Sequence, residues 1–324
     1  MLSSKICLLV LSLLPLIAIS GCTSSGGGIG PGVVILSWEP ELSQVYSNEN
    51  VDLLVKVQNQ GESRAKNVIA EITNIDLVEW GGLFQEQVQL GQLIPADEVS
   101  STPGETKTSQ FQNLRAPILS KGQSFDYQPT VRVSYDYRTV AQKPITIVDQ
   151  IELVRIQQQG NTLPSKVTTY SSGPLTVEIV MGNYVKTSSR FGMGGETYDI
   201  FPVQIKITNN LWGSGGSVIP MGIGGMGGGF GTGQYDYPVL VKVTPPTGTN
   251  FIFSGYGDDC SSFQFTTELF KGKEAEVTCE LEVTSPPTAR SESLLQVELD
   301  YRYFVDSVTN LRVLGTKEAG TFGF

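Results

Sequence analysis

The 324-residue sequence contains no histidine, which limits the kinds of catalytic and metal-binding sites that its side chains can form. Histidine is the commonest general base and the commonest protein ligand for transition metals. Ser–His–Asp catalysis, Cys–His catalysis and zinc sites that use histidine are therefore excluded. A hydrolase with paired carboxylates or a Ser–Lys enzyme remains compatible with the composition. We expect no cofactor and no metal ion.

The four cysteines are the next candidates, and Cys22 stands where covalent chemistry is expected. Lys5 precedes an apolar run at 6–19. This run is shorter than the roughly 20 residues that a membrane-spanning helix needs, and Pro15 would interrupt such a helix. A basic start, an apolar stretch and a small-residue end indicate a secretory signal peptide at 1–21. Residues 19–22 (Ile-Ser-Gly-Cys) resemble a lipobox, where the signal is cleaved before a cysteine that receives lipid.

Lipid on Cys22 would hold the mature chain through residues 22–32, a tether rich in glycine and serine. Each acyl CH₂ group that enters the bilayer contributes about 0.8 kcal/mol to this attachment. We therefore expect an exported protein that is anchored to the outer face of the cytoplasmic membrane, at the cell surface. The alternatives are an ordinary secretory peptide and an uncleaved short anchor, and in both of these Cys22 has no role.

Two further cysteines belong to the mature chain, because Cys7 would leave with the signal peptide. Cys260 and Cys279 are an even pair in an oxidising compartment, and we predict a disulfide between them. The alternative is two unpaired buried thiols. The neighbouring Asp258 and Asp259 carry the oxygen ligands that Ca²⁺ prefers. Since no EF-hand or β-roll spacing surrounds them, a solvated acidic turn is the preferred interpretation.

The charge balance argues against nucleic acid as a partner. The chain has 22 Lys and Arg residues against 32 Asp and Glu residues, a net charge of −10. The acidic residues are spread over both halves of the chain without a block. Nucleic-acid binding needs a basic face, whereas an even negative charge keeps an exposed protein soluble.

Alternation of apolar and polar residues dominates the mature chain and predicts β-strands. Residues 130–138 are the clearest case, since Val131, Val133 and two tyrosines share one face. Strands recur every 10–20 residues with Gly, Pro and Asn between them. The fold class expected is all-β, with two tandem antiparallel sandwiches of the immunoglobulin type. We place domain 1 at 33–156, a linker at 157–164 and domain 2 at 165–324.

The two predicted domains repeat each other. Three matches occur in the same order: 54–59 with 204–209, 103–106 with 271–274, and 131–138 with 295–302. The offsets are 150, 168 and 164 residues, and they differ only by the lengths of loops. Three matches in order indicate a tandem repeat.

These halves resemble the immunoglobulin-like modules found in tandem on archaeal and bacterial envelope proteins, the CARDB-like and S-layer-associated group. The resemblance lies in a turn at 56–61 (Lys-Val-Gln-Asn-Gln-Gly), a turn at 103–106 (Pro-Gly-Glu-Thr) and residues 135–137 (Tyr-Asp-Tyr). It spans 33–155 and, more loosely, 173–315. It implies adhesion, spacing or envelope assembly rather than catalysis. The tether is likewise similar to those of archaeal surface lipoproteins.

A glycine-rich insertion at 213–233 distinguishes the second half, and a shorter relative lies at 191–195. Residues 222–227 fit G-x-G-x-x-G, but they lie between β segments instead of between a strand and a helix. We therefore reject nucleotide binding there. The possible partner contacts are apolar side chains of the two loops, which suit adaptable binding: Phe191, Met193, Met221, Ile223, Met226 and Phe230.

The intervening strand should place the two loops at opposite ends of domain 2. Four interpretations of the long loop remain: packing at the interdomain junction, a protein partner, membrane contact, or no fixed structure. The short loop would lie at the free tip of a rod whose domain 1 sits next to the membrane. Alternating tyrosines late in each half are either core residues, which we favour, or a carbohydrate-binding face: Tyr135, Tyr137, Tyr301 and Tyr303.

The leading functional hypothesis is a lipid-anchored, non-catalytic cell-surface protein that acts in binding, adhesion or envelope assembly. Its partner would be an unknown envelope protein or polysaccharide, besides the membrane that holds the anchor. One alternative is a membrane-interacting protein that uses the apolar glycine-rich loop. Another is a carboxylate-dependent hydrolase of envelope polymers.

Overall fold

The structure is a computed structural model that describes residues 30–82, 85–97, 99–188, 199–219, 236–252 and 263–316. Strands form most of this part of the chain, and α1 is the one α-helix within it. The predicted all-β fold class is therefore confirmed. The elements are β1 (Val33–Pro40), β2 (Gln44–Tyr46), β3 (Asn50–Asn59), β4 (Ala65–Thr73), β5 (Gln87–Leu93), β6 (Thr106–Arg115), β7 (Ser124–Tyr127), β8 (Thr130–Asp149), α1 (Gln150–Gln158), β9 (Thr169–Tyr170), β10 (Leu175–Val180), β11 (Val185–Thr187), β12 (Ile200–Asn209), β13 (Gly216–Val218), β14 (Pro238–Thr244), β15 (Thr249–Phe251), β16 (Gln264–Glu268), β17 (Glu274–Val283), β18 (Arg290–Val308) and β19 (Leu311–Leu314).

The first unit of the fold contains two groups of paired strands. One sheet has the order β1-β3-β6, and in the other β4 lies between β5 and the first part of β8. Every second residue of β3 is buried, including Leu53, Val55 and Val57. This alternation turns one apolar face of each sheet toward a shared core, as in a β-sandwich.

The second unit is built in the same way from later strands. One sheet has the order β10-β12-β17-β15, and β14 lies between β16 and β18 in the other. The inward residues of β12 are Val203, Ile205 and Ile207, and all three are buried. The sequence match between 54–59 and 204–209 therefore corresponds to the middle strand of a sheet in each unit.

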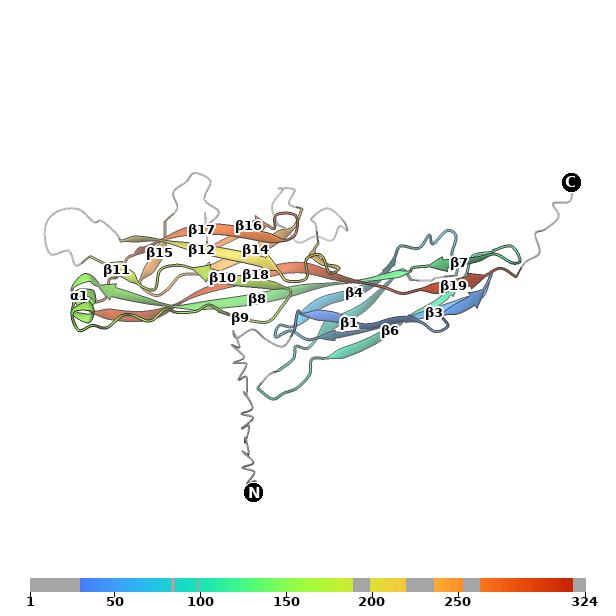
Figure 1. The fold of residues 1–324 in the computed structure, drawn as a ribbon, viewed down its shortest axis with the longest axis horizontal. Coiled ribbons are helices and arrows are strands. Elements are labelled where there is room, and N and C mark those ends of the chain that lie inside the picture. Colours follow the sequence, from blue (N-terminus) through green and yellow to red (C-terminus); the bar gives the residue numbers. More distant parts are fainter. Residues whose placement is uncertain are drawn as a thin grey trace, which may run out of the picture.

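The two units are joined by the two longest strands, which we call the central ribbon. β8 and β18 pair antiparallel along their length, from Thr130 opposite Val308 to Val148 opposite Arg290. At roughly 3.3 Å per residue, β8 is about 66 Å long. The ribbon follows the long axis of the molecule and merges both units into one nine-stranded sheet (Figure 1).

Each strand of the central ribbon serves both units. The first part of β8 pairs with β4 of the first unit, and its later part pairs with β9 and β11 of the second. β18 runs the other way, since it pairs with β14 before it continues beside the first unit. Beyond β18, β19 forms a small sheet with β2 and β7 at the end of the first unit. Neither half of the sheet is therefore complete without a strand from the other half.

The strand order in the shared sheet reflects the sequence repeat. The order is β16-β14-β18-β8-β4-β5, which reads alike from both edges when β4 is matched with β14 and β5 with β16. The third sequence match relates Tyr137 to Tyr301, and these two residues are direct partners in the ribbon. Equivalent residues that meet each other are the mark of an isologous, two-fold arrangement.

The predicted linker at 157–164 is wrong, because the chain does not pass between the units there. β8 makes the crossing without a break, and it ends at Asp149, whose carboxylate accepts the Ile151 amide hydrogen at 2.8 Å and caps α1. Leu163 then packs with Leu153 of α1 and Val148 of β8. The polar composition of 157–164 marks the turn after a helix at the far end of the second unit, opposite the β2-β19-β7 sheet (Figure 1).

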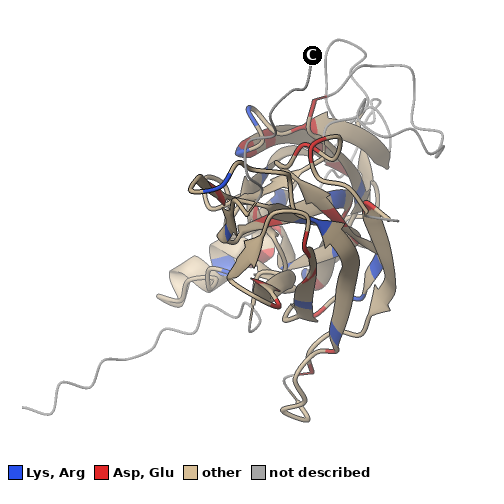
Figure 2. Ribbon diagram, turned by 90° about the vertical axis from the view of Figure 1, so that its right-hand side faces the viewer, with Lys and Arg blue, Asp and Glu red and all other residues tan. Residues whose placement is uncertain are grey.

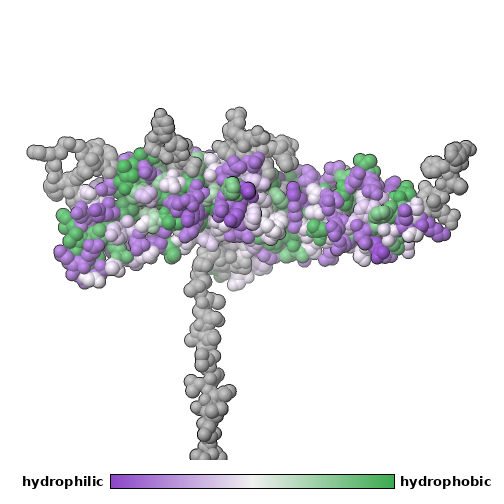
Figure 3. Space-filling model, turned by 45° about the horizontal axis from the view of Figure 1, so that its top comes forward, coloured by the Kyte–Doolittle hydropathy of each residue, from purple (hydrophilic) through white to green (hydrophobic). Residues whose placement is uncertain are grey.

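The surface of the described residues mixes charge and hydropathy. Viewed along the rod, Lys and Arg residues are interspersed with Asp and Glu residues (Figure 2). Hydrophobic and hydrophilic residues likewise alternate along the face in Figure 3. This pattern agrees with the even spread of charge in the sequence.

Candidate functional site

The middle of the central ribbon contains an Asp-Tyr-Arg sequence in each strand, and the two copies pair with each other. Arg138 donates two hydrogen bonds to Asp300, with Nε–Oδ1 at 2.7 Å and Nη2–Oδ2 at 2.8 Å. Arg302 donates one to Asp136, with Nη1–Oδ1 at 3.0 Å. The sequence is self-complementary because its acid and base lie two residues apart on one face of an antiparallel pair.

These charge pairs define the register of the ribbon. A slip of two residues would place Arg138 opposite Arg302, or Asp136 opposite Asp300, so that like charges would face each other. The hydrogen bonds to Asp300 raise the pKa of Arg138. Its side chain is 54% exposed, and a pair of this kind contributes roughly 0–1 kcal/mol. The pairs therefore select an alignment more than they stabilise the fold.

Four tyrosines lie at the centre of the ribbon on its other face, and we call them the tyrosine cluster: Tyr135, Tyr137, Tyr301 and Tyr303. Their ring centroids are 5.8–6.2 Å apart between neighbours. All four side chains are buried. The core interpretation is thus confirmed, and a carbohydrate-binding face made of these rings is excluded.

The hydroxyl groups of the cluster connect the ribbon to both units. Tyr137 accepts a hydrogen bond from the Ser63 amide and donates one to the Ser172 carbonyl, each at 3.1 Å. Tyr303 donates to Oδ1 of Asn209 at 2.6 Å. Burial raises the pKa of both hydroxyls because a tyrosinate would lose its hydration there. The buried Tyr135 hydroxyl has no hydrogen-bond partner among the described residues.

Asn59 and Asn209 occupy matching positions in the two units, 150 residues apart. Each side-chain Oδ1 accepts the amide hydrogen two residues later, from Gly61 at 3.2 Å and from Leu211 at 3.0 Å. Each Nδ2 group donates to two backbone carbonyls, one in a neighbouring loop and one at the end of a neighbouring strand. Both side chains are buried. The resemblance placed a turn at 56–61; in the structure β3 continues to Asn59, and the turn at 59–61 has a counterpart with the same side-chain hydrogen bond at 209–211.

The described chain begins beside this same centre. The Gly30 amide donates to Ser172 Oγ at 3.1 Å, and the Gln60 amide donates to the Gly32 carbonyl at 2.8 Å. The Ser172 carbonyl accepts the Tyr137 hydroxyl. The chain thus enters the fold at the middle of the rod. The strand that follows the predicted tether therefore begins at the junction of the two units and not at an end of the rod.

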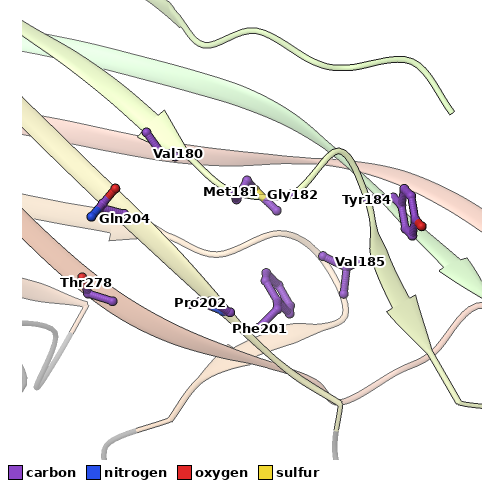
Figure 4. Close-up of a pocket in the computed structure, with 9 residues that line it drawn as sticks. All are labelled: Val180, Met181, Gly182, Tyr184, Val185, Phe201, Pro202, Gln204 and Thr278. Atoms are coloured by element: carbon purple, nitrogen blue, oxygen red, sulfur yellow. The ribbon is translucent and has the colours of Figure 1, made fainter.

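A separate groove of about 540 Å³ opens at the α1 end of the second unit. Phe201 and Pro202 of β12 lie below Met181 and Val185, which belong to the segment from β10 to β11 (Figure 4). Its polar groups come from Tyr184, Gln204 and Thr278, and the described residues of its lining include no Asp, Glu, Lys or Arg. The groove can receive an apolar group of a partner, but these residues supply no acid–base pair.

The predicted site residues fall mostly outside the described part of the chain. These are Cys22, Cys260, Asp258, Asp259, Phe191, Met193, Met221, Ile223, Met226 and Phe230. Cys279 is described and lies buried on β17. The disulfide and the partner contacts therefore stay predictions.

The described residues that flank the two loops lie at different places in the second unit. Gly216 to Val218, at the start of the glycine-rich insertion, form β13 and pair with Val305 to Tyr303 beside the tyrosine cluster. Ser188, just before the shorter loop, donates its amide hydrogen to Asp199 at 2.6 Å near the α1 end. The loops therefore start at opposite ends of the second unit, as the length of the intervening strand predicted.

Sequence reasoning matched the two Asp-Tyr-Arg copies as a repeat but missed that they pair. The available signal was the placement of opposite charges on either side of a tyrosine, which suits antiparallel pairing of the motif with itself. It also missed α1 and the groove. The groove carries no such signal, because its residues come from separate strands.

The described side chains show no group of three Cys, Asp or Glu residues that could hold a metal ion. Hydrogen bonds lower the pKa of two exposed carboxylates: Ser100 lowers the pKa of Asp97, and Arg155 lowers that of Glu152. A carboxylate that acts as a general acid near neutral pH needs a raised pKa. Neither of these two residues suits that role.

No protein-family model matches this sequence, and no curated protein matches it. Among the described residues, no helix is both long and apolar enough to cross a membrane.

Proposed function

We propose that the protein is a lipid-anchored, non-catalytic cell-surface protein that acts in binding, adhesion or envelope assembly. The observation that carries the proposal is the position of Cys22. It lies three residues after the apolar run at 6–19, and it precedes Gly30, the first described residue, by eight positions. A lipid on Cys22 would therefore be followed almost at once by the folded rod.

The fold supports a structural or binding role through its shape. A ribbon of about 66 Å runs through both units and is shared by their cores. Two immunoglobulin-like halves on such a ribbon form a stiff bar that offers its ends and edges to other molecules. The apolar groove near α1 can accommodate an apolar segment of an envelope protein.

Export supports the predicted disulfide as part of the same proposal. Cys279 lies buried in the sheet of the second unit. A bridge to Cys260 would tie β17 to the segment before β16, and it would form only in an oxidising compartment.

The test is the intact mass of the protein taken from its native membranes. We expect the chain to begin at Cys22 and to carry one or more acyl chains on that residue. A Cys22→Ser variant should lose the acyl mass and leave the membrane fraction. A mature chain that begins elsewhere, or a Cys22→Ser variant that stays on the membrane with wild-type mass, would refute the anchor.

A further inference from the structure

The entry point of the chain restricts how the rod can lie on a membrane. Gly30 is fixed by Ser172, and Ser172 is fixed by Tyr137, which pairs with Tyr301 at the centre of the ribbon. The attachment point is therefore known from described residues, independently of the tether's own conformation.

The two arms of the rod that leave this point are similar in length. From Tyr137, β8 continues for 12 residues to Asp149, which at roughly 3.3 Å per residue is about 40 Å. From Tyr301, β18 and β19 continue for 13 residues to Leu314, or about 43 Å. α1 lies beyond the first of these ends, and the β2-β19-β7 sheet forms the second (Figure 1).

The tether is short compared with either arm. Eight residues separate Cys22 from Gly30, and a flexible chain of that length has an r.m.s. span of about 16 Å. Fully extended, it reaches about 28 Å. An upright rod would place one end about 40 Å below the attachment point, which is deeper than the tether allows. If the rod makes an angle of more than about 45° with the membrane plane, one of its ends would enter the bilayer even when the tether is fully extended.

We propose that the rod lies along the membrane, held at its middle, with the side from which Gly30 emerges facing the lipid. This inference rests on the proposed anchor at Cys22. The two ends of the rod then stay at similar heights above the bilayer, and the opposite side of the rod faces away from the lipid. The groove near α1 would meet partners beside it in the plane of the envelope, instead of partners far above the surface.

The test measures the thickness of the protein layer on a supported bilayer by neutron reflectometry, with the full-length lipidated protein. Six strands, β16-β14-β18-β8-β4-β5, follow one another across the shared sheet, which makes a flat rod about 30 Å wide at 4.8 Å per strand. The layer with its tether should therefore be about 30–45 Å thick. A rod that stands on one end would give a layer of more than about 80 Å.

A matched variant changes the tether and leaves the fold intact. Forty Gly and Ser residues inserted after Ser25 would raise the r.m.s. span of the tether to about 38 Å, close to the length of one arm. We expect this variant to form a thicker and more diffuse layer than the wild-type protein. An equally thin layer for both proteins would overturn the tether as the cause of the orientation.

Failure of the orientation and failure of the anchor are distinguishable. Acyl chains on Cys22 together with a layer of more than about 80 Å would overturn the flat orientation alone. A protein that carries no lipid at Cys22, as shown by its intact mass, would overturn the anchor and with it the orientation.

Discussion

Replacement of Asn209 by alanine tests whether the two units unfold as one body. The Asn209 side chain is buried, and it joins the second unit to the ribbon by accepting the Tyr303 hydroxyl at 2.6 Å. It also accepts the Leu211 amide hydrogen and donates to the Gly272 carbonyl at 2.9 Å. The alanine variant leaves these three groups without their partner.

The expected loss of unfolding free energy depends on how many buried groups lose their hydrogen-bond partner. A buried donor or acceptor that loses its partner costs about 1–3 kcal/mol. We therefore expect Asn209→Ala to lower the free energy of unfolding by about 3–5 kcal/mol. Tyr303→Phe removes one hydroxyl and leaves the Leu211 contact in place, so that its cost should be about 1 kcal/mol. The double variant should show coupling above about 0.5 kcal/mol, since the two side chains touch.

The assay is urea unfolding followed by two signals in a Trp212→Phe background. Fluorescence then comes from Trp38 and Trp80, which are buried in the first unit. Circular dichroism reports both units. If the shared ribbon makes them one cooperative body, Asn209→Ala lowers both midpoints equally, by roughly 1 M or more.

A different pattern would refute this reasoning. If the fluorescence midpoint of the first unit stays in place while the circular dichroism shows an earlier separate step, the units are independent. A cost below about 1 kcal/mol would show instead that water replaces the lost hydrogen bonds.

Three further outcomes follow from the structure. Gly104→Ala should destabilise the fold by about 3 kcal/mol or more in thermal unfolding, because the added Cβ would overlap the Asn59 carbonyl. Gly81→Ala is the control and should be nearly neutral, since its added Cβ would have no atom closer than 3.9 Å. Arg138→Gln should cost less than about 1 kcal/mol, and the difference should shrink further in high salt, because the pair is exposed. Burial raises the pKa of Tyr127 to about 12 and also raises the pKa values of the tyrosine cluster. The contribution of these five hydroxyls to stability should therefore be constant below about pH 10 and fall above it. The tyrosinate absorbance of the buried cluster should appear only as the protein unfolds.

The all-β fold and its inward faces follow from the sequence because burial at every second residue is a local property of a strand. Residues 130–138 and 204–209 show this, and both form strands with the expected faces buried. The matching role of Asn59 and Asn209 was also contained in the repeat, since both residues close the same kind of turn.

The pairing of β8 with β18 is a long-range property that alternation alone does not specify. The apolar residues at 145–156 belong to two different structures, because β8 ends at Asp149 and the Asp149 side chain caps α1. The polar residues after α1 then resembled a linker. The contacts at the centre of the rod could not be predicted from local patterns either, because they join residues near 30, 137, 172 and 301.

The most direct test of the interlocked ribbon is a cross-link between Arg138 and Asp300. These residues are direct partners, and opposite residues in antiparallel strands have Cα atoms about 4.5–5.5 Å apart, within the range for a disulfide. The Arg138→Cys, Asp300→Cys protein should form this bridge within one chain on mild oxidation, as seen by peptide mass mapping. A Lys56→Cys, Asp300→Cys control, with Lys56 on β3 of the other sheet, should not. No bridge between 138 and 300, or a bridge only between chains, would contradict the shared ribbon.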